Sequence, residues 1–294
     1  MRVLHFSDIH LPTALRGAPA RSFFGKRAVG WLNLQLRRKG AFRDGFPKVE
    51  ALSSLCSDQE VDLLIMSGDY STLGTEVELA AARQAVDPLI AQALSYVTVP
   101  GNHDVYLPDA LRDGRFERHF GDLLGSDLPN RCTDGPWPLV RLVGDEVAVV
   151  VVNSSRPNPQ VLRSSGRVPA EQLASLMQIL DEPPIRTRFV FIVTHYAPCL
   201  ADGRGDKPHH GLENAHELLA AVAEVERGAL LCGHIHHGYR VQVPEVQIPI
   251  FCAGSATYAG RENVWLFDIE PDGARCAQGS WSGEGWHLGD WSRV

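Results

Sequence analysis

The stretch that decides the fold is Val99-Pro100-Gly101-Asn102-His103-Asp104, which closes an apolar run that begins at Ser95. The run has the length and composition of a buried strand, and its proline and glycine end it abruptly. Three side chains that can bind a metal or move a proton follow at once. Such side chains at the carboxyl end of a strand are typical of the sites of α/β proteins. We therefore predict a functional site at this turn.

The rest of the chain alternates strand-length apolar runs with amphipathic helical segments. This alternation, followed by a mostly stranded C-terminal part, is typical of an α/β sandwich with a mixed sheet. No linker or internal repeat divides the sequence, so we expect a single domain over residues 1–294. The patterns predict strands over 2–7, 61–66, 95–99, 138–143, 147–152, 189–193, 229–232, 239–243, 248–252, 264–269 and 274–281, and helices over 46–57, 76–93, 109–124, 169–180 and 212–225.

Composition narrows the class of function before any further motif is considered. The formal net charge of −7 disfavours nucleic acid as a general partner. A hydrophobic content of 44% is sufficient for a large core, and no apolar run is long enough to span a bilayer. Because the N-terminus runs straight into strand-like sequence without a signal peptide, we expect a cytoplasmic protein.

Four further strand ends carry the same kind of polar side chain. Neighbouring strand ends converge at one edge of a sheet, so we expect these side chains to meet. Carboxylates, imidazoles and one amide oxygen suit divalent metals of intermediate hardness, and there are enough ligands for two ions. A single histidine at a strand end is more often a polar cap than a metal ligand, but the recurrence of such residues at five strand ends favours a metal site. The residues are Asp8 with His10, Asp69, Asn102 with His103, His195, and His234 with His236.

In this order the strand-end residues resemble the motifs of the calcineurin-like metallophosphoesterase superfamily. The family pattern is D-x-H, G-D, G-N-H-[DE], H and G-H-x-H, and the resemblance extends from residue 8 to residue 236. It implies an α/β fold that is a four-layer sandwich, in which two mixed β-sheets are flanked by helices. The matching segments are Asp8-Ile9-His10, Gly68-Asp69, Gly101-Asn102-His103-Asp104, His195 and Gly233-His234-Ile235-His236.

The resemblance also implies a role for each motif residue. Two divalent ions, which would be manganese, iron or zinc, would share the carboxylate of Asp69, and a hydroxide bridging them would attack phosphorus. His103 would protonate the leaving oxygen, and Asp104 would fix the loop or orient a neighbouring ligand. By the same resemblance, the first ion is held by Asp8, His10 and His236, and the second by Asn102, His195 and His234.

The sequence departs from the family pattern directly after Asp69. Many relatives have a second acidic residue there, in the form G-D-x-x-D, whereas Tyr70-Ser71-Thr72 follow in this chain. A carboxylate that orients His103 must therefore come from elsewhere.

Two residues outside the motifs are candidates for contact with the substrate. Arg156 lies with Arg163 and Arg167 in a polar loop, and arginine is a natural clamp for phosphate oxygens. The alternative for this loop is simple solvation. His237 directly follows the last motif, so it is close enough to the predicted site to matter.

A basic amphipathic insertion is predicted at about residues 12–45. From Ile9 to Arg43 the chain has eight Lys or Arg and no Asp or Glu. A helix here suits peripheral contact with a membrane or a lipid-like substrate through residues 16–43. The alternative is a helical insertion packed on the domain with its cations in solvent. The apolar face would comprise Phe24, Ala28, Trp31, Leu32 and Leu36, and the other face Lys26, Arg27, Arg37 and Arg38.

The length of the chain and its lack of extra domains are similar to the bacterial cyclic-nucleotide phosphodiesterase branch of the family. We therefore expect a small phosphorylated substrate, namely a phosphodiester such as a cyclic nucleotide. One alternative is a pyrophosphatase acting on a lipid-linked nucleotide such as UDP-diacylglucosamine, peripheral to the inner face of the membrane. The other is a binding scaffold that has lost catalysis, which the complete set of motif residues disfavours.

Overall fold

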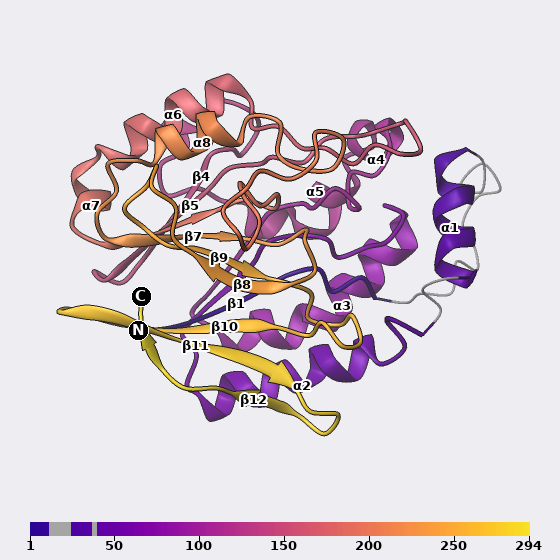
Figure 1. The fold of residues 1–294 in the computed structure, drawn as a ribbon, viewed down its shortest axis with the longest axis horizontal. Coiled ribbons are helices and arrows are strands. Elements are labelled where there is room, and N and C mark those ends of the chain that lie inside the picture. The colour runs from indigo at the N-terminus through magenta and orange to yellow at the C-terminus, as the bar shows by residue number, and fades with distance from the viewer. Residues whose placement is uncertain (12–24, 37–39) are drawn as a thin grey trace.

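Two β-sheets face each other, and helices cover their outer sides (Figure 1). The computed structural model describes residues 1–11, 25–36 and 40–294, with only the backbone described for residues 34–36. Helices α2 (Gly45–Asp58) and α3 (Glu76–Gln92) pack on the first sheet, and α6 (Ala170–Leu180) and α8 (Ala215–Ala221) on the second. This arrangement confirms the predicted four-layer sandwich.

The first sheet is parallel at its centre and antiparallel on one side. Strands β1, β2 and β3 run parallel, so their carboxyl ends meet at one edge of the sheet. Strand β10 pairs antiparallel with β1 and begins the C-terminal half of the sheet. The strand order is β12 (Trp286–Leu288), β11 (Gly273–Trp281), β10 (Val264–Glu270), β1 (Arg2–Phe6), β2 (Leu63–Met66) and β3 (Ser95–Thr98), with β13 (Ser292–Arg293) paired to β11.

The second sheet has four parallel strands between two antiparallel edge strands. It therefore also gathers the carboxyl ends of its central strands at one edge. The strand order is β4 (Leu139–Val143), β5 (Val147–Val151), β6 (Phe189–Val193), β7 (Gly228–Cys232), β9 (Ile250–Ala253) and β8 (Gly238–Val241).

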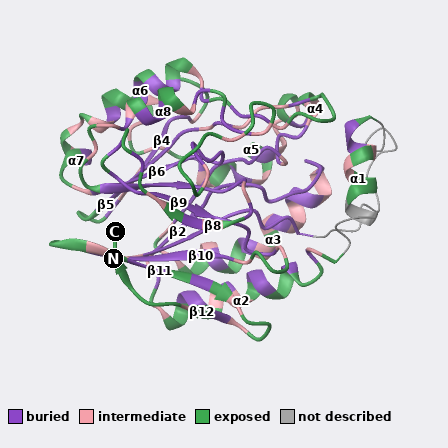
Figure 2. Cartoon of the chain, viewed as in Figure 1, coloured by how far each residue is buried: buried purple, intermediate pink, exposed green. Residues whose placement is uncertain are grey.

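The main core lies between the two sheets and follows from the two-residue period of a strand. In β5, Val147 and Val149 point to the opposite sheet, whereas Ala148 and Val150 point to the layer of α6 and α8. All four are fully buried (Figure 2), and a buried valine contributes on the order of 1.5 kcal/mol or more. Both faces of this strand are therefore apolar, which is why its sequence is a continuous hydrophobic run.

The structure corrects two of the predicted helices. The segment 109–124 is not one helix, because Gly114 has a φ of 57° and interrupts it. The predicted helix over 212–225 is shorter and corresponds to α8. Helix α7 and strands β12 and β13 were not predicted. The broken segment comprises α4 (Pro108–Arg112), α5 (Arg115–Phe120) and the 3₁₀ turn Gly121–Leu123, and α7 spans Pro183–Arg186.

The basic insertion forms helix α1 (Lys26–Leu36), and its orientation is the reverse of the prediction. Lys26 and Arg27 are buried rather than solvated. The Lys26 ammonium donates to the carbonyls of Asn158 and Arg163, at 2.7 and 2.8 Å. The predicted positions Phe24, Leu36, Arg37 and Arg38 lie outside the described side chains.

The Arg27 guanidinium fixes the other side of α1. Its Nε donates to the carbonyl of Leu73 at 3.0 Å, and its two terminal nitrogens form a bidentate pair with Asp109. The predicted apolar face is instead turned outward, with Trp31 38% and Leu32 50% exposed. Helix α1 is therefore attached to the protein by its cations. In the part of the chain that the structure describes, no helix is both long enough and apolar enough to cross a bilayer.

We expect Arg27→Met to loosen α1 while the rest of the fold persists. The substitution leaves the Leu73 carbonyl without its donor and removes a bidentate ion pair. Charged hydrogen bonds of this kind contribute about 1.5–3 kcal/mol, so local opening should rise about tenfold or more. Limited chymotrypsin digestion at Trp31, followed by mass spectrometry, measures this opening.

The matched control is Arg112→Met, because Arg112 is 72% exposed and pairs with its neighbour Asp113. Equal cleavage rates in the two variants would contradict the anchoring role of Arg27.

Candidate metal centre

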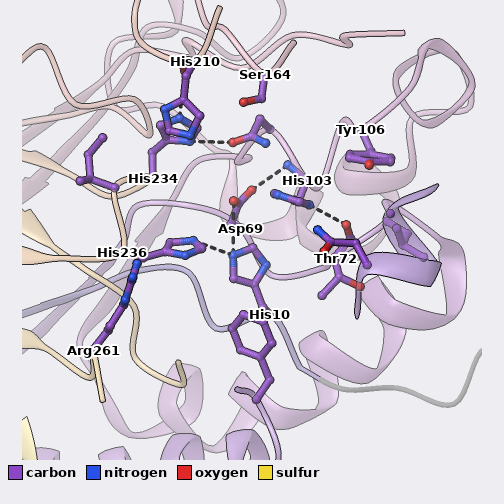
Figure 3. A pocket seen from close by; sticks show the side chains of 16 residues that line it. His10, Asp69, Thr72, His103, Tyr106, Ser164, His210, His234, His236 and Arg261 are labelled. Carbon is purple, nitrogen blue, oxygen red and sulfur yellow. Dashed lines mark hydrogen bonds and ion pairs between the residues drawn. The ribbon is translucent and has the colours of Figure 1, made fainter. Parts of the chain in front are cut away.

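The predicted site residues are brought together where the carboxyl ends of the two sheets face each other. Figure 3 labels five of them, namely His10, Asp69, His103, His234 and His236. Residues from β1, β2 and β3 approach from the first sheet, and residues from β6 and β7 approach from the second. All seven predicted ligands are buried. They are Asp8 and His10 after β1, Asp69 after β2, Asn102 after β3, His195 after β6, and His234 and His236 after β7.

The first group of donors surrounds the Nε2 atom of His10. The Nδ1 of this ring donates to the carbonyl of Ser71 at 2.8 Å, so the lone pair is on Nε2. That atom lies 3.6 Å from an oxygen of Asp8 and 3.6 Å from Oδ2 of Asp69. The Nε2 of His236 is 3.1 Å from both His10 Nε2 and Asp8 Oδ1. One nitrogen pair and two carboxylates thus converge on one point.

The second group of donors surrounds the amide oxygen of Asn102. His195 donates from Nδ1 to the carbonyl of Ser67, which directs its Nε2 lone pair toward Asn102 Oδ1 at 3.1 Å. His234 donates from Nε2 to the carbonyl of His210, which leaves Nδ1 as its free nitrogen, 2.9 Å from the same amide oxygen. The two histidines therefore offer different ring nitrogens.

Asp69 lies between the two groups. Its Oδ2 is 3.6 Å from His10 Nε2 and 3.5 Å from His195 Nε2. Its other oxygen accepts the backbone N–H of His103 at 2.7 Å, which fixes the orientation of the carboxylate. A single oxygen directed at both groups is the geometry that a shared, bridging ligand requires.

Backbone strain is concentrated in the same residues. Six residues other than glycine have a positive φ in the described parts of the chain, and five of them are predicted ligands. Such conformations cost on the order of 1–3 kcal/mol each and persist only where surrounding contacts enforce them. Here Asp8 N donates to the carbonyl of Gly68, and Asp8 Oδ2 accepts the N–H of His234. The five strained ligands are Asp8, His10, Asp69, His234 and His236.

Asp104 lies where a loop-fixing residue was expected. Its fully buried carboxylate accepts the backbone N–H groups of Gly101, Asp69 and Ser71 at 2.8, 3.0 and 2.9 Å. It also accepts the Ser71 hydroxyl at 3.0 Å. One side chain thereby joins the loop after β3 to the loop after β2.

The electrostatics of the buried groups fit divalent cations. Burial lowers the pKa of His195 to about 4 and that of His234 well below its usual value, so both rings are neutral at pH 7, the form in which imidazole binds a metal. Burial, together with the charges of Asp8 and Asp104, raises the pKa of Asp69 well above its usual range. Adjacent carboxylates and neutral imidazoles therefore form a donor set that needs positive charge, and its nitrogen and oxygen atoms suit two divalent ions.

His103 is held at Nδ1 by a backbone group, a kind of partner that the sequence did not suggest. Its Nδ1 donates to the carbonyl of Thr72 at 2.5 Å, and its ring stacks on Tyr106 with the centroids 5.4 Å apart. Thr72 occupies the position of the second acidic residue in the G-D-x-x-D pattern. A main-chain carbonyl has no sequence signature, so this partner could not be predicted from residue types.

Five of the seven predicted ligands and His103 line a cavity of about 320 Å³; the five are His10, Asp69, Asn102, His234 and His236. The sequence favoured an exposed loop position for His210 over a place beside the substrate, and it gave no role to Arg261, although both line the cavity. The ring of His210 packs 4.3 Å from that of His234, and its Nδ1 donates to Asp206. Arg261 follows Gly260 in a loop beyond the last motif, where no spacing rule indicates a function.

Two predicted substrate-contact residues do not line this cavity. Arg156 forms an ion pair with Glu213, which Arg163 also contacts. The Arg156 side chain lines a different cavity, together with Arg167. His237 is exposed and lines a neighbouring cavity.

The family model described as calcineurin-like phosphoesterase matches residues 1–238. The chain therefore belongs to the calcineurin-like phosphoesterase family, and it is a metallophosphoesterase whose donor clusters fit a dinuclear metal site. It is 25% identical over 240 residues to a probable cyclic nucleotide phosphodiesterase of Synechococcus sp., a match that covers 80% of this chain and 82% of the relative.

Solved structures show the same fold at low identity. A dimetal phosphatase from Danio rerio has a TM-score of 0.66 at 12% identity, covering 100% of this chain and 98% of its own. The purple acid phosphatase PPD1 from yellow lupin has a TM-score of 0.65 at 11% identity, covering 99% of this chain and 52% of its own.

We expect Asp69→Asn to reduce metal content at both positions and to lower turnover by at least about a hundredfold. Changes to residues that only orient metal ligands already cost roughly 10–100-fold, and here the shared oxygen itself loses its charge. Metal analysis of the purified protein after dialysis, with parallel turnover assays, measures both effects. Asp62→Asn is the control, since that carboxylate lies outside the cluster and accepts the N–H of Arg2. Retention of two metals with normal turnover would exclude Asp69 as the bridge.

Proposed function

We propose that the protein hydrolyses a small phosphodiester, with a cyclic nucleotide as the leading candidate substrate, in the cytoplasm. The observation that carries this proposal is the shared Oδ2 atom of Asp69, placed between two donor groups and beside His103. The Synechococcus relative, described as a probable cyclic nucleotide phosphodiesterase, supports the choice of substrate class.

The proposal assigns the ligands in two sets. When bound, two divalent cations supply Lewis-acid activation of the phosphoryl group and of water. Manganese, iron and zinc all accept nitrogen and oxygen donors of this kind. Asp69 belongs to both sets; Asp8, His10 and His236 complete the first, and Asn102, His195 and His234 complete the second.

His103 is assigned as the proton donor to the leaving oxygen. Because its Nδ1–H is engaged by the Thr72 carbonyl, the proton that moves must be the one on Nε2. After the transfer the neutral ring retains its hydrogen bond to Thr72. The stack on Tyr106 restricts rotation of the ring, so the same nitrogen is presented at each turnover.

The cavity favours a small substrate. Its volume of about 320 Å³ is at the lower end of the range for small-molecule sites. Gly30 and Asn33 of α1 line it opposite the sheets. A Cβ atom on Gly30 would lie 2.8 Å from both Leu73 Cδ2 and Tyr106 Oη, so glycine permits this close approach. The net charge of −7 also disfavours a nucleic-acid substrate.

We expect His103→Ala to keep both metals and to slow hydrolysis by about 10²–10⁴-fold for substrates with a basic leaving group. The loss should be much smaller for a p-nitrophenyl ester, because p-nitrophenolate leaves without a proton. Comparison of a cyclic nucleotide with bis-p-nitrophenyl phosphate, together with metal analysis, tests the assignment. Loss of metal in the variant would identify His103 as a ligand instead.

A second candidate substrate is a lipid-linked nucleotide such as UDP-diacylglucosamine. The observation that favours it is the outward-facing apolar set Val29, Trp31 and Leu32 on the helix that also lines the cavity. Such a set suits the surface of a membrane, next to which acyl chains would lie. In this case the protein would contact the inner face of the membrane peripherally.

If this candidate is correct, the double substitution Trp31→Ser with Leu32→Ser should reduce binding to anionic vesicles and hydrolysis of acylated pyrophosphates. It should spare bis-p-nitrophenyl phosphate, because the metal ligands lie elsewhere. Vesicle sedimentation at low and high salt measures the binding. Leu162→Ser is the control, because Leu162 is 87% exposed and lies outside α1. Absence of vesicle binding by the wild-type protein would leave the soluble diester as the substrate.

A further inference from the structure

Arg261 is the single Lys or Arg among the described residues that line the metal cavity. It also lines a second cavity of about 470 Å³, together with the polar residues His237, Gln278 and Ser280 and the acidic residues Glu262 and Asp290. The guanidinium therefore lies at the junction between the metal cavity and a neighbouring polar cavity. In Figure 3, Arg261 and His103 lie on opposite sides of Asp69.

Aromatic packing supports Arg261 on the side of the first donor group. Its guanidinium carbon lies 5.0 Å from the centroid of the Tyr258 ring, a cation–π contact. The Tyr258 ring packs in turn against Phe42 at 5.1 Å and His236 at 5.8 Å. Phe42 packs on His10 at 5.2 Å. A continuous set of rings thus connects Arg261 with two predicted metal ligands.

Hydrogen bonds attach the loop of Arg261 to the loop that carries Asp8. The Ser255 hydroxyl donates to the carbonyl of Asp8 at 2.6 Å, and the Thr257 hydroxyl donates to the carbonyl of Ile9 at 2.6 Å. Ser255 and Thr257 are fully buried. The position of Arg261 relative to the first donor group is therefore fixed by the backbone.

No ion pair with a described residue neutralises the charge of Arg261. The adjacent carboxylate of Glu262 is drawn to the buried ammonium of Lys48, at 2.7 Å. Among the described residues no carboxylate lies within 4.0 Å of the Arg261 guanidinium, and the undescribed segments contain no Asp or Glu. An exposed cation that is held in place and borders the metal cavity is suited to bind an anion from solution.

We propose that Arg261 binds an anionic group on the part of the substrate that stays attached to phosphorus after cleavage. The leaving group faces His103, so the retained part extends to the opposite side, past Arg261 and toward the polar cavity. Within the proposed class of small phosphodiesters, the enzyme then prefers those that carry a second negative charge, as a carboxylate or a further phosphate, over singly charged diesters such as a simple cyclic nucleotide. This inference rests on the proposed diester hydrolysis.

The test uses p-nitrophenyl alkyl phosphodiesters that share one leaving group and differ only at the far end of the alkyl chain. The far end is a methyl, a trimethylammonium, a carboxylate or a phosphate. We expect the wild-type enzyme to show KM values about tenfold lower for the two anionic substrates than for the methyl substrate, the size of one charged hydrogen bond. Arg261→Gln should abolish this preference, and added salt should weaken it.

Two control variants separate binding from structural damage. Arg261→Lys keeps the charge without the planar fork, so it should retain part of the preference. Arg186→Gln, on α7 and outside the cavity, should behave as the wild type. Comparison of the carboxylate substrate with the phosphate substrate shows which of the two anionic groups Arg261 prefers. A preference that survives in Arg261→Gln, or an equal loss on all four substrates, would overturn the inference.

A binding measurement keeps this inference separate from the proposed function. Non-hydrolysable methylphosphonate monoesters with the same four far ends are titrated calorimetrically into the metal-loaded wild type and Arg261→Gln. Tighter binding of the anionic esters that is lost in the variant supports the role of Arg261, even if no diester is turned over. Hydrolysis of none of the four diesters would reject the proposed function, whereas equal Kd values for all four phosphonates would reject this inference.

Discussion

The buried carboxylate of Asp104 is the contact on which the rest of the site depends. By accepting N–H groups of Gly101 and Asp69, it holds two chain segments closer than side chains would allow. A Cβ on Gly101 would lie 2.0 Å from the Asp69 carboxylate, and one on Gly68 would lie 2.6 Å from Gly101 N. The glycines of these motifs are therefore required by the contact, and the contact in turn fixes the orientation of Asp69.

The two sheets supply the rigidity that this geometry needs. Apolar side chains alternate across β5 and fill the space between the layers, so the strand ends cannot shift independently. Ligand residues with positive φ are tolerated there because the loops hold one another, as when Asp8 accepts the N–H of His234. Stability in the core thus permits strain at the edge, where neutral imidazoles and carboxylates converge.

The sequence was sufficient to predict most of the strands and which polar side chains meet at their ends, because an apolar run followed by glycine and polar residues has few structural alternatives. Features that depend on backbone partners were not predictable. The Thr72 carbonyl, which orients His103, is a main-chain group, so no residue type in the sequence indicates its role. The cations of α1 were predicted to lie in solvent, because charged side chains usually do. Instead, Lys26 and Arg27 donate to buried carbonyl oxygens. Arg261 lies in a loop with no periodicity.

The buried cations of α1 support His103, the proposed proton donor, more directly than they support the predicted metal ligands. Arg27 binds the carbonyl of Leu73, the residue after the one that holds the His103 ring. Lys26 lies 4.8 Å from the ring of Tyr106, on which His103 stacks. The predicted metal ligands depend instead on Asp104 and the strand ends. If His103 is the proton donor, a change that loosens α1 should disturb proton transfer before it disturbs metal binding, and the insertion would then act on catalysis through His103.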